Sequence, residues 1–310
     1  MEEKADGLEH YNRVALVLAS VFLLVTSFFL KESNFMDMGN TGFLSLAAGL
    51  AMDILLLVSV YITSEPLVPH HQDRLVAVTL SAAVLFACPG AVVASVIHPA
   101  SIALLWAQFC LLKEEYFIAF FLMGISAMFF PPVLWIAALV VILMLAAGLS
   151  DPLRNLLKFL GGLLVPYMLT LGAAYVAGFD VTGWISEFWS KMTTISTGFL
   201  SLEIPILFLV VCITFMCIHA SVLFLGRMSE CGIAESYALK VQIINVVVSA
   251  AVFFLFASSS GAPVALLACC PVAVLLARYF AGYGRSSFLR IEIVILLCAL
   301  VISRLGNFIV

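Results

Sequence analysis

The sequence predicts an all-α protein, a polytopic transmembrane helical bundle of about eleven spans that forms a single integral membrane domain over residues 1–310. Composition is the first reason: 64% of the residues are apolar, 10% are charged, and the mean hydropathy is +1.20. A soluble domain is about half apolar and about a quarter charged. The second reason is that apolar runs approaching the roughly 20 residues that cross a bilayer follow one another with short connections. We therefore expect no soluble domain.

The apolar runs define the elements in order. The first, 14–30, ends in "FFLKES" without a small-residue cleavage site, so we expect a retained anchor. The prolines in "SVIHPAS" and "MFFPPVLW" separate neighbouring runs, because a proline disfavours helix at the residue before it. The remaining spans are expected at 42–62, 75–96, 99–112, 116–130, 133–149, 159–177, 204–225, 241–257, 263–281 and 291–310.

The positions of Lys and Arg form the third observation, and they predict a cytoplasmic N-terminus with the C-terminus outside. Cytoplasmic loops hold an excess of these residues. With eleven spans, eleven of the 14 Lys and Arg fall inside, and only Lys31, Lys191 and Arg304 fall outside. Nine longer spans would leave Lys113 within a span. We expect a multi-pass protein of the inner (cytoplasmic) membrane, with outer loops at 31–41 and 178–203.

The charge balance and the cysteines exclude some classes of function. A net charge of −4 without a long basic cluster argues against a nucleic-acid partner. The eight cysteines lie mainly in apolar runs without a Cys-x-x-Cys pair, and no metal-ligand spacing is present. Membrane lipid is the expected partner. In the long outer loop Ile185, Phe188 and Trp189 recur at helical spacing, which predicts an amphipathic helix lying flat on the membrane.

Asp53 is the candidate binding residue inside a span. It stands eleven residues into the second span, roughly 16 Å from the outer end and so near the bilayer midplane. A carboxylate there costs at least about 2.5–3.5 kcal/mol and marks a functional site by default. The alternative is a packing device that hydrogen-bonds to a neighbouring helix. Under either interpretation we expect Asp53 to have a partner on another helix.

Other candidates lie toward the outer face. Asp37 and Glu32, in the first outer loop, are candidate catalytic bases or ligands for a metal or sugar, or else solvated loop acids. Arg304 and Lys191 are candidates for binding a lipid phosphate, or else snorkel to headgroups. Pro99, which follows His98, predicts that His98 lies at an exposed outer turn. There the histidine either binds a ligand or has no specific role.

Further polar features lie in or beside the spans. His219 falls inside the eighth span, where we expect a hydrogen bond to a neighbouring helix. Proline and glycine interrupt three spans, at "CPG" (88–90), at Pro166 and at Pro271. Such an interruption either lines a cavity or serves only packing. One inner loop and the span after it form either a polar inner site or a solvated connection with charge pairs. Its polar residues are Arg227, Glu230, Glu235, Lys240, Gln242 and Asn245.

The stretch "HPASIALLWAQFCLLKEEYFIAFFLMGISAMFFPPVLWIAAL" resembles the central part of polytopic transferases of the GT-C fold, which use polyprenyl-phosphate-linked sugars. This resemblance implies a cytoplasmic N-terminus and an acid in the first outer loop as base or metal ligand. Asp37 matches that position, and Glu32 matches it less well. The whole chain, including "DPLRNLLKFLGGLLVPY" and "CCPVAVLLARYF", is similar to an uncharacterised family of inner-membrane proteins of Bacteroidota.

Three functions are consistent with these observations. The first is a GT-C-like glycosyltransferase in envelope glycan assembly, with Asp37 as base and Arg304 or Lys191 on the carrier phosphate. The second is a small-molecule or ion-coupled transporter with a midplane site at Asp53. The third is a non-catalytic membrane scaffold subunit, in which every polar residue only packs. The depth of the two acids separates the first two, because Asp37 is shallow and Asp53 is deep.

Overall fold

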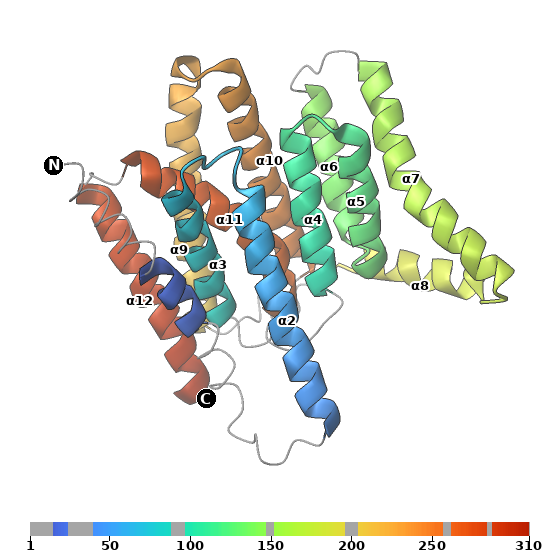
Figure 1. The fold of residues 1–310 in the computed structure, drawn as a ribbon, viewed down its shortest axis with the longest axis horizontal. Coiled ribbons are helices and arrows are strands. Elements are labelled where there is room, and N and C mark those ends of the chain that lie inside the picture. Colours follow the sequence, from blue (N-terminus) through green and yellow to red (C-terminus); the bar gives the residue numbers. More distant parts are fainter. Residues whose placement is uncertain are drawn as a thin grey trace.

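The computed structural model describes residues 15–23, 40–87, 97–146, 152–195, 204–256, 262–283 and 287–309, and every regular element within them is a helix. Most of these helices lie side by side and run alternately in opposite directions (Figure 1). Their bounds are α2 Asn40–Thr63, α3 His71–Ala87, α4 Ile97–Leu112, α5 Tyr116–Phe129, α6 Val133–Ala146, α7 Pro152–Val176, α8 Val181–Thr193, α9 Ile204–Arg227, η3 Met228–Glu230, α10 Ile233–Phe256, α11 Ala262–Tyr283 and α12 Ser287–Ile309.

The predicted spans from 42–62 onward each coincide with one helix, which confirms the all-α class. The largest differences are at two starts: α7 begins at Pro152 where 159 was predicted, and α10 begins at Ile233 where 241 was predicted. In both cases polar residues precede the apolar run, and backbone hydrogen bonding continues a helix through them. Of the predicted first span, residues 15–23 are helical and the others lie outside the described residues.

Length and composition indicate a membrane protein. Among the described residues three helices are long and apolar enough to cross a bilayer, at Leu153–Val176, Ile204–Glu230 and Ile233–Phe256. Several other apolar helices are shorter, such as α5 and α6 with 14 residues each, which at 1.5 Å per residue span about 21 Å. The count of eleven spans and the direction of insertion stay predictions.

The alternation of the helices places the predicted inner connections at one end of the bundle. The turns between α2 and α3, between α4 and α5, and at η3 all lie at the upper end of Figure 1. Lys113 and Arg227 belong to this end, which we call the basic end. Helix α8, which carries Lys191, lies at the opposite end.

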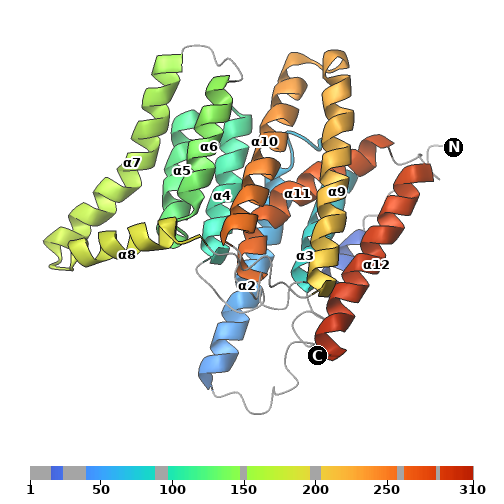
Figure 2. The same cartoon turned by 180° about the vertical axis from the view of Figure 1, so that it is seen from behind.

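The predicted amphipathic helix of the long outer loop is present as α8, which lies across the direction of the other helices (Figure 2) and buries none of its residues. Its N-cap is Asp180, whose carboxylate accepts a 2.9 Å hydrogen bond from the Gly183 amide. That hydrogen bond lowers the pKa of Asp180. At the other end the Trp135 indole of α6 donates to the Met192 carbonyl at 3.1 Å. Contact of α8 with a membrane surface stays a prediction.

Pro166 and Pro271 lie inside continuous helices, α7 and α11, so the expected break of the helix is wrong at both, and the alternative that these prolines serve packing stays a prediction. An internal proline removes one backbone hydrogen bond, and neighbouring helices of a membrane protein re-satisfy such groups. At α11 the Gln242 side chain of α10 donates to the carbonyl of Pro271 itself at 2.7 Å, which joins the two helices at the proline. The predicted interruption at 88–90 lies outside the described residues.

Candidate functional site

The deepest acid of the sequence pairs with a histidine from another helix. Asp53 lies in the middle of α2 and His98 in the first turn of α4. The Asp53 Oδ1 and His98 Nε2 atoms are 3.3 Å apart, and the two side chains are 2% and 1% exposed. The expected partner of Asp53 on another helix is therefore confirmed. The expected exposed turn at His98 is wrong, because Pro99 follows it inside the first turn of a buried helix, a position that proline tolerates.

Four helices meet around this pair. Cys269 of α11 is within electrostatic reach of Asp53, and its thiol donates to the Ser81 carbonyl of α3 at 3.7 Å. Toward the basic end, the Trp106 indole of α4 donates to the Ser59 hydroxyl of α2 at 3.2 Å. These contacts fix α2, α3, α4 and α11 around one buried carboxylate.

Buried polar side chains form a stripe on α4 that begins at His98, and a second stripe on α10, a helix that packs against α4. On α4 the stripe consists of His98, Ser101 and Gln108, spaced three and seven residues apart, so they share one face. Its α10 members are Gln242, Asn245 and Ser249, spaced three and four residues apart. All six are at most 3% exposed. We call these six residues, with Asp53, the polar core.

The α10 stripe faces the space between α4 and α11. Tyr237 of α10 donates to the Leu111 carbonyl of α4 at 3.2 Å, whereas Gln242 donates to the Pro271 carbonyl of α11. Asn245 lies between these two directions on the helical wheel. The polar core is therefore an internal feature of the bundle and does not face its surroundings.

Several atoms of the polar core have no hydrogen-bond partner among the described residues. They are both amide atoms of Asn245, the Gln108 amide nitrogen and the hydroxyls of Ser101 and Ser249. Leaving one buried polar group unsatisfied costs about 1–3 kcal/mol. Buried groups of this kind are normally satisfied by ordered water or by a ligand. The polar core therefore offers unpartnered hydrogen-bonding groups to water or to a polar solute.

A cavity of about 410 Å³ opens next to the polar core at the basic end. Its lining is mostly apolar and includes Leu112, Ala238 and Leu239, and its charged residues are Glu235 and Arg278, which form an ion pair. Gln108 lies one turn from Leu112 on α4, and Gln242 one turn from Ala238 on α10. The cavity, which we call the vestibule, therefore adjoins the first polar residues of both stripes.

The vestibule and the Asp53–His98 pair mark the two ends of the polar core. Leu112 and His98 are fourteen residues apart on α4, and Glu235 and Ser249 are fourteen residues apart on α10. Each separation is about 21 Å of helix. Of the six residues of the predicted polar inner site, Gln242 and Asn245 are buried, and the other four, Arg227, Glu230, Glu235 and Lys240, are exposed as in a solvated connection. Glu235 pairs across helices with Arg278.

The outer candidates do not gather at this site. Asp37 and Glu32 lie outside the described residues, as does the side chain of Arg304. Lys191 is 61% exposed on α8 and pairs with Glu187 at 2.6 Å. That contact lowers the pKa of the Glu187 carboxyl. A role of these residues in binding a lipid phosphate or a sugar stays a prediction.

A second buried carboxylate was missed by the sequence analysis. Glu292 of α12 is 3% exposed, and its Oε1 lies 2.9 Å from Nδ1 of His219 on α9. The Tyr279 hydroxyl of α11 donates to its Oε2 at 2.7 Å. The expected hydrogen bond from His219 to a neighbouring helix is confirmed. Glu292 is the second residue of its predicted span, so its charge was attributed to the end of the span. The signal that could have identified it is that it lies inside the apolar run and not before it.

The family model described as "Family of unknown function (DUF6427)" matches residues 10–308, and the chain belongs to this family. Neither a curated protein nor a solved structure matches the sequence. Within the described residues, no three His, Cys, Asp or Glu side chains group as metal ligands. Functional inference therefore depends on the geometry of the buried polar groups.

Proposed function

We propose that this member of the DUF6427 family is a proton-coupled transporter of the inner membrane. In this proposal a small polar solute or cation enters the polar core from the vestibule, and the Asp53–His98 pair binds the coupling proton. The observation that carries the proposal is the paired, fully buried Asp53 at one end of a stripe of polar atoms that lack partners. An ionisable residue at membrane depth marks an ion or substrate pathway by default.

The chemistry of the pair explains coupling. Asp53 and His98 together carry one negative charge when the pair holds no extra proton and no charge when it holds one. Because a net charge is costly in a low-dielectric interior, the proton-loaded state is favoured at rest. A cation, or a solute with a cationic group, that reaches the pair replaces the proton as the compensating charge. Loss of the proton and entry of the solute are then linked.

The neutral members of the polar core supply the path to this pair. Gln108 and Asn245 offer unpartnered amide atoms, and Ser101 and Ser249 offer hydroxyls that donate or accept a hydrogen bond. Such groups replace part of the hydration shell of a polar solute without adding charge. At the entrance, the ion pair of Glu235 and Arg278 presents both signs of charge to the vestibule.

The test is proton flux into proteoliposomes that contain the purified protein and a trapped pH-sensitive dye. A sodium gradient supplies the cation, because in the proposal the proton leaves only as a cation enters, and valinomycin with equal potassium on both sides holds the membrane potential at zero. We expect flux well above that of empty liposomes, reduced at least about tenfold in Asp53→Asn and in His98→Gln, because neither variant pair retains the acid and the base together. Asn245→Leu, which removes both unpartnered amide atoms without a charge change, should reduce the flux as well.

Glu187→Gln is the matched control, because it removes a carboxylate that is 65% exposed on α8 and remote from the polar core. It should leave the flux unchanged. Size-exclusion profiles show whether each variant is folded. Folded Asp53→Asn with wild-type flux would contradict the proposal. Flux of the wild type and of every variant equal to that of empty liposomes would contradict it as well and would favour the scaffold.

Lipid-linked sugar transfer is the second candidate, and the observation that favours it is the position of α8. This exposed amphipathic helix lies at the end of the bundle where α2 begins, directly after the predicted loop that contains Asp37 (Figures 1 and 2). Its test is transfer from a polyprenyl-phosphate-linked sugar to a membrane acceptor. Loss of transfer in Asp37→Ala with normal proton flux would favour this candidate over transport.

A further inference from the structure

Three helices enclose the Glu292 carboxylate on the side of the bundle formed by α9, α11 and α12. Both of its oxygens have a partner: Oε1 lies 2.9 Å from His219 Nδ1, and Oε2 accepts from the Tyr279 hydroxyl at 2.7 Å. The same hydroxyl is 3.0 Å from His219 Nδ1. The carboxylate has no direct access to solvent, since its side chain is 4% exposed.

His219 is the group that connects this carboxylate with the outside of the bundle. Its side chain is 29% exposed, whereas Glu292 and Tyr279 are buried. The other neighbours of its ring are two phenyl groups, Phe215 of α9 and Phe288 of α12, at centroid distances of 6.5 and 5.1 Å. The ionisable groups in hydrogen-bond contact with it are Glu292 from α12 and Tyr279 from α11.

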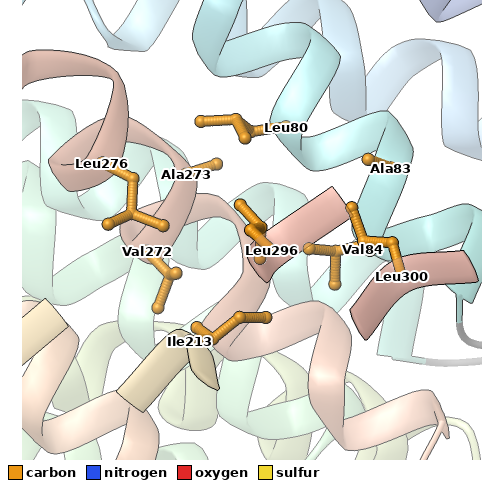
Figure 3. A pocket seen from close by; sticks show the side chains of 9 residues that line it. All are labelled: Leu80, Ala83, Val84, Ile213, Val272, Ala273, Leu276, Leu296 and Leu300. Atoms are coloured by element: carbon orange, nitrogen blue, oxygen red, sulfur yellow. The ribbon is translucent and has the colours of Figure 1, made fainter. Parts of the chain in front are cut away.

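Aliphatic packing closes the other side of the site. One turn further from the basic end, Leu276 of α11 and Leu296 of α12 meet Ile213 of α9 around a void of about 10 Å³ (Figure 3). Figure 3 shows only alkyl side chains converging there. A void that small with no polar lining cannot hold a hydrogen-bonded water. A proton on Glu292 therefore has no polar route in this direction.

We propose that His219, Tyr279 and Glu292 form a second proton-binding site, in which Glu292 stores the proton and His219 relays it. In the relay, a hydronium ion gives a proton to His219 Nε2 and becomes water, while the Nδ1 proton passes to Glu292 Oε1 and makes it a carboxylic acid. In the reverse transfer Glu292 returns its proton to Nδ1 while Nε2 releases one to water, so the site unloads and the imidazole regains its first tautomer. The Tyr279 hydroxyl keeps its hydrogen bond to Oε2 and orients the carboxylate. This site stands independently of the Asp53–His98 pair.

The experiment is infrared spectroscopy of the reconstituted full-length protein during steps from about pH 8 to about pH 5, the range in which histidine exchanges protons. We expect a carbonyl band of a buried carboxylic acid that grows as the pH falls and is absent in Glu292→Gln. In His219→Gln the band should still form but at least about tenfold more slowly after a pH jump, because the amide cannot relay a proton.

The assignment does not depend on one variant. Tyr279→Phe removes the hydroxyl donor and should shift the frequency of the same band without abolishing it. Asp53→Asn should leave the band intact, which separates this site from the proposed transport site, and exposed Glu187→Gln serves as the control. A band that persists in Glu292→Gln, no pH-dependent band in the wild type, or wild-type kinetics in His219→Gln would overturn the proposal. If Glu292→Gln does not fold, the Tyr279→Phe variant decides: a band at the wild-type frequency in that variant would overturn the proposal.

Discussion

Two adjacent glycines of α7 should respond in opposite directions to the same substitution. A Cβ added at Gly162 would lie 2.4 Å from the Phe117 carbonyl oxygen of α5 and 3.1 Å from the Phe121 nitrogen. A Cβ added at Gly161 would meet only the Phe117 ring, at an ordinary 3.6 Å. We therefore predict that Gly162→Ala destabilises the protein and that Gly161→Ala stabilises it.

The magnitudes follow from these distances. Ordinary contact begins at 3.4 Å, so Gly162→Ala must separate α5 from α7 by about 1 Å, and the contacted oxygen belongs to a helix backbone that cannot rotate away. Overpacking of this kind costs about 1–3 kcal/mol, and the gain in helix propensity offsets about 1 kcal/mol. Gly161→Ala keeps that gain. We expect a difference of about 2 kcal/mol between the variants, which corresponds to roughly 4–8 °C in midpoint.

The assay is thermal unfolding of the purified variants in one detergent, followed by the loss of the monodisperse peak in size-exclusion chromatography. Gly172→Ala is the control on the same helix, because its added Cβ meets nothing within 4 Å. Equal midpoints for Gly161→Ala and Gly162→Ala would refute the close crossing of α5 and α7.

Three other predictions concern packing and capping. Ser126→Ala should lower the stability by about 1 kcal/mol, because its hydroxyl donates to the Ala100 carbonyl at 2.7 Å in a buried site; Ser126→Thr, which keeps the donor, is the comparison in the same thermal assay. Leu276→Ala should cost about 2–5 kcal/mol by enlarging an existing void, and a midpoint equal to the wild type would contradict that packing. Asp180→Ala should speed amide hydrogen exchange in α8 near neutral pH, since it removes the cap on Gly183. Because the folded pKa of Asp180 lies below its usual value, the stabilisation by the carboxylate is complete at neutral pH and is lost only as the pH falls through that pKa. An amide hydrogen-exchange rate in α8 that is the same in Asp180→Ala and in the wild type would refute the role of Asp180 as the cap.

Most of the helical architecture could be predicted because run length and proline are local signals. The bounds of α4, α5 and α6 lie within three residues of the predicted ones. The starts of α7 and α10 could not be placed by hydropathy, because a helix that continues past its apolar run no longer differs from a polar loop in composition. The sequence also could not show that the helices continue through Pro166 of α7 and Pro271 of α11. Whether an internal proline breaks a helix depends on the groups that pack beside it.

Of the buried Asp53–His98 pair, only Asp53 could be predicted as a buried site residue from the sequence. A lone acid in an apolar run identifies Asp53 and requires a partner, but it does not name the helix that supplies it. The partner is His98, and the proline after it suggested an exposed turn, whereas the same proline is compatible with the first turn of a buried helix. The vestibule could not be predicted at all, since its lining comes from four separate segments of the chain.

The two carboxylates argue together against packing as their only purpose. A device that only joins helices needs matched partners, and replacing a buried ion pair by apolar residues is often neutral or stabilising. Asp53 nevertheless lies at the end of a stripe in which Asn245 has neither amide atom satisfied among the described residues. Glu292 in turn has both oxygens satisfied, and one of its partners, His219, reaches the outside. Unpartnered polar atoms in the first case and a partly exposed histidine in the second are the features on which the two proposals of proton and solute movement rest.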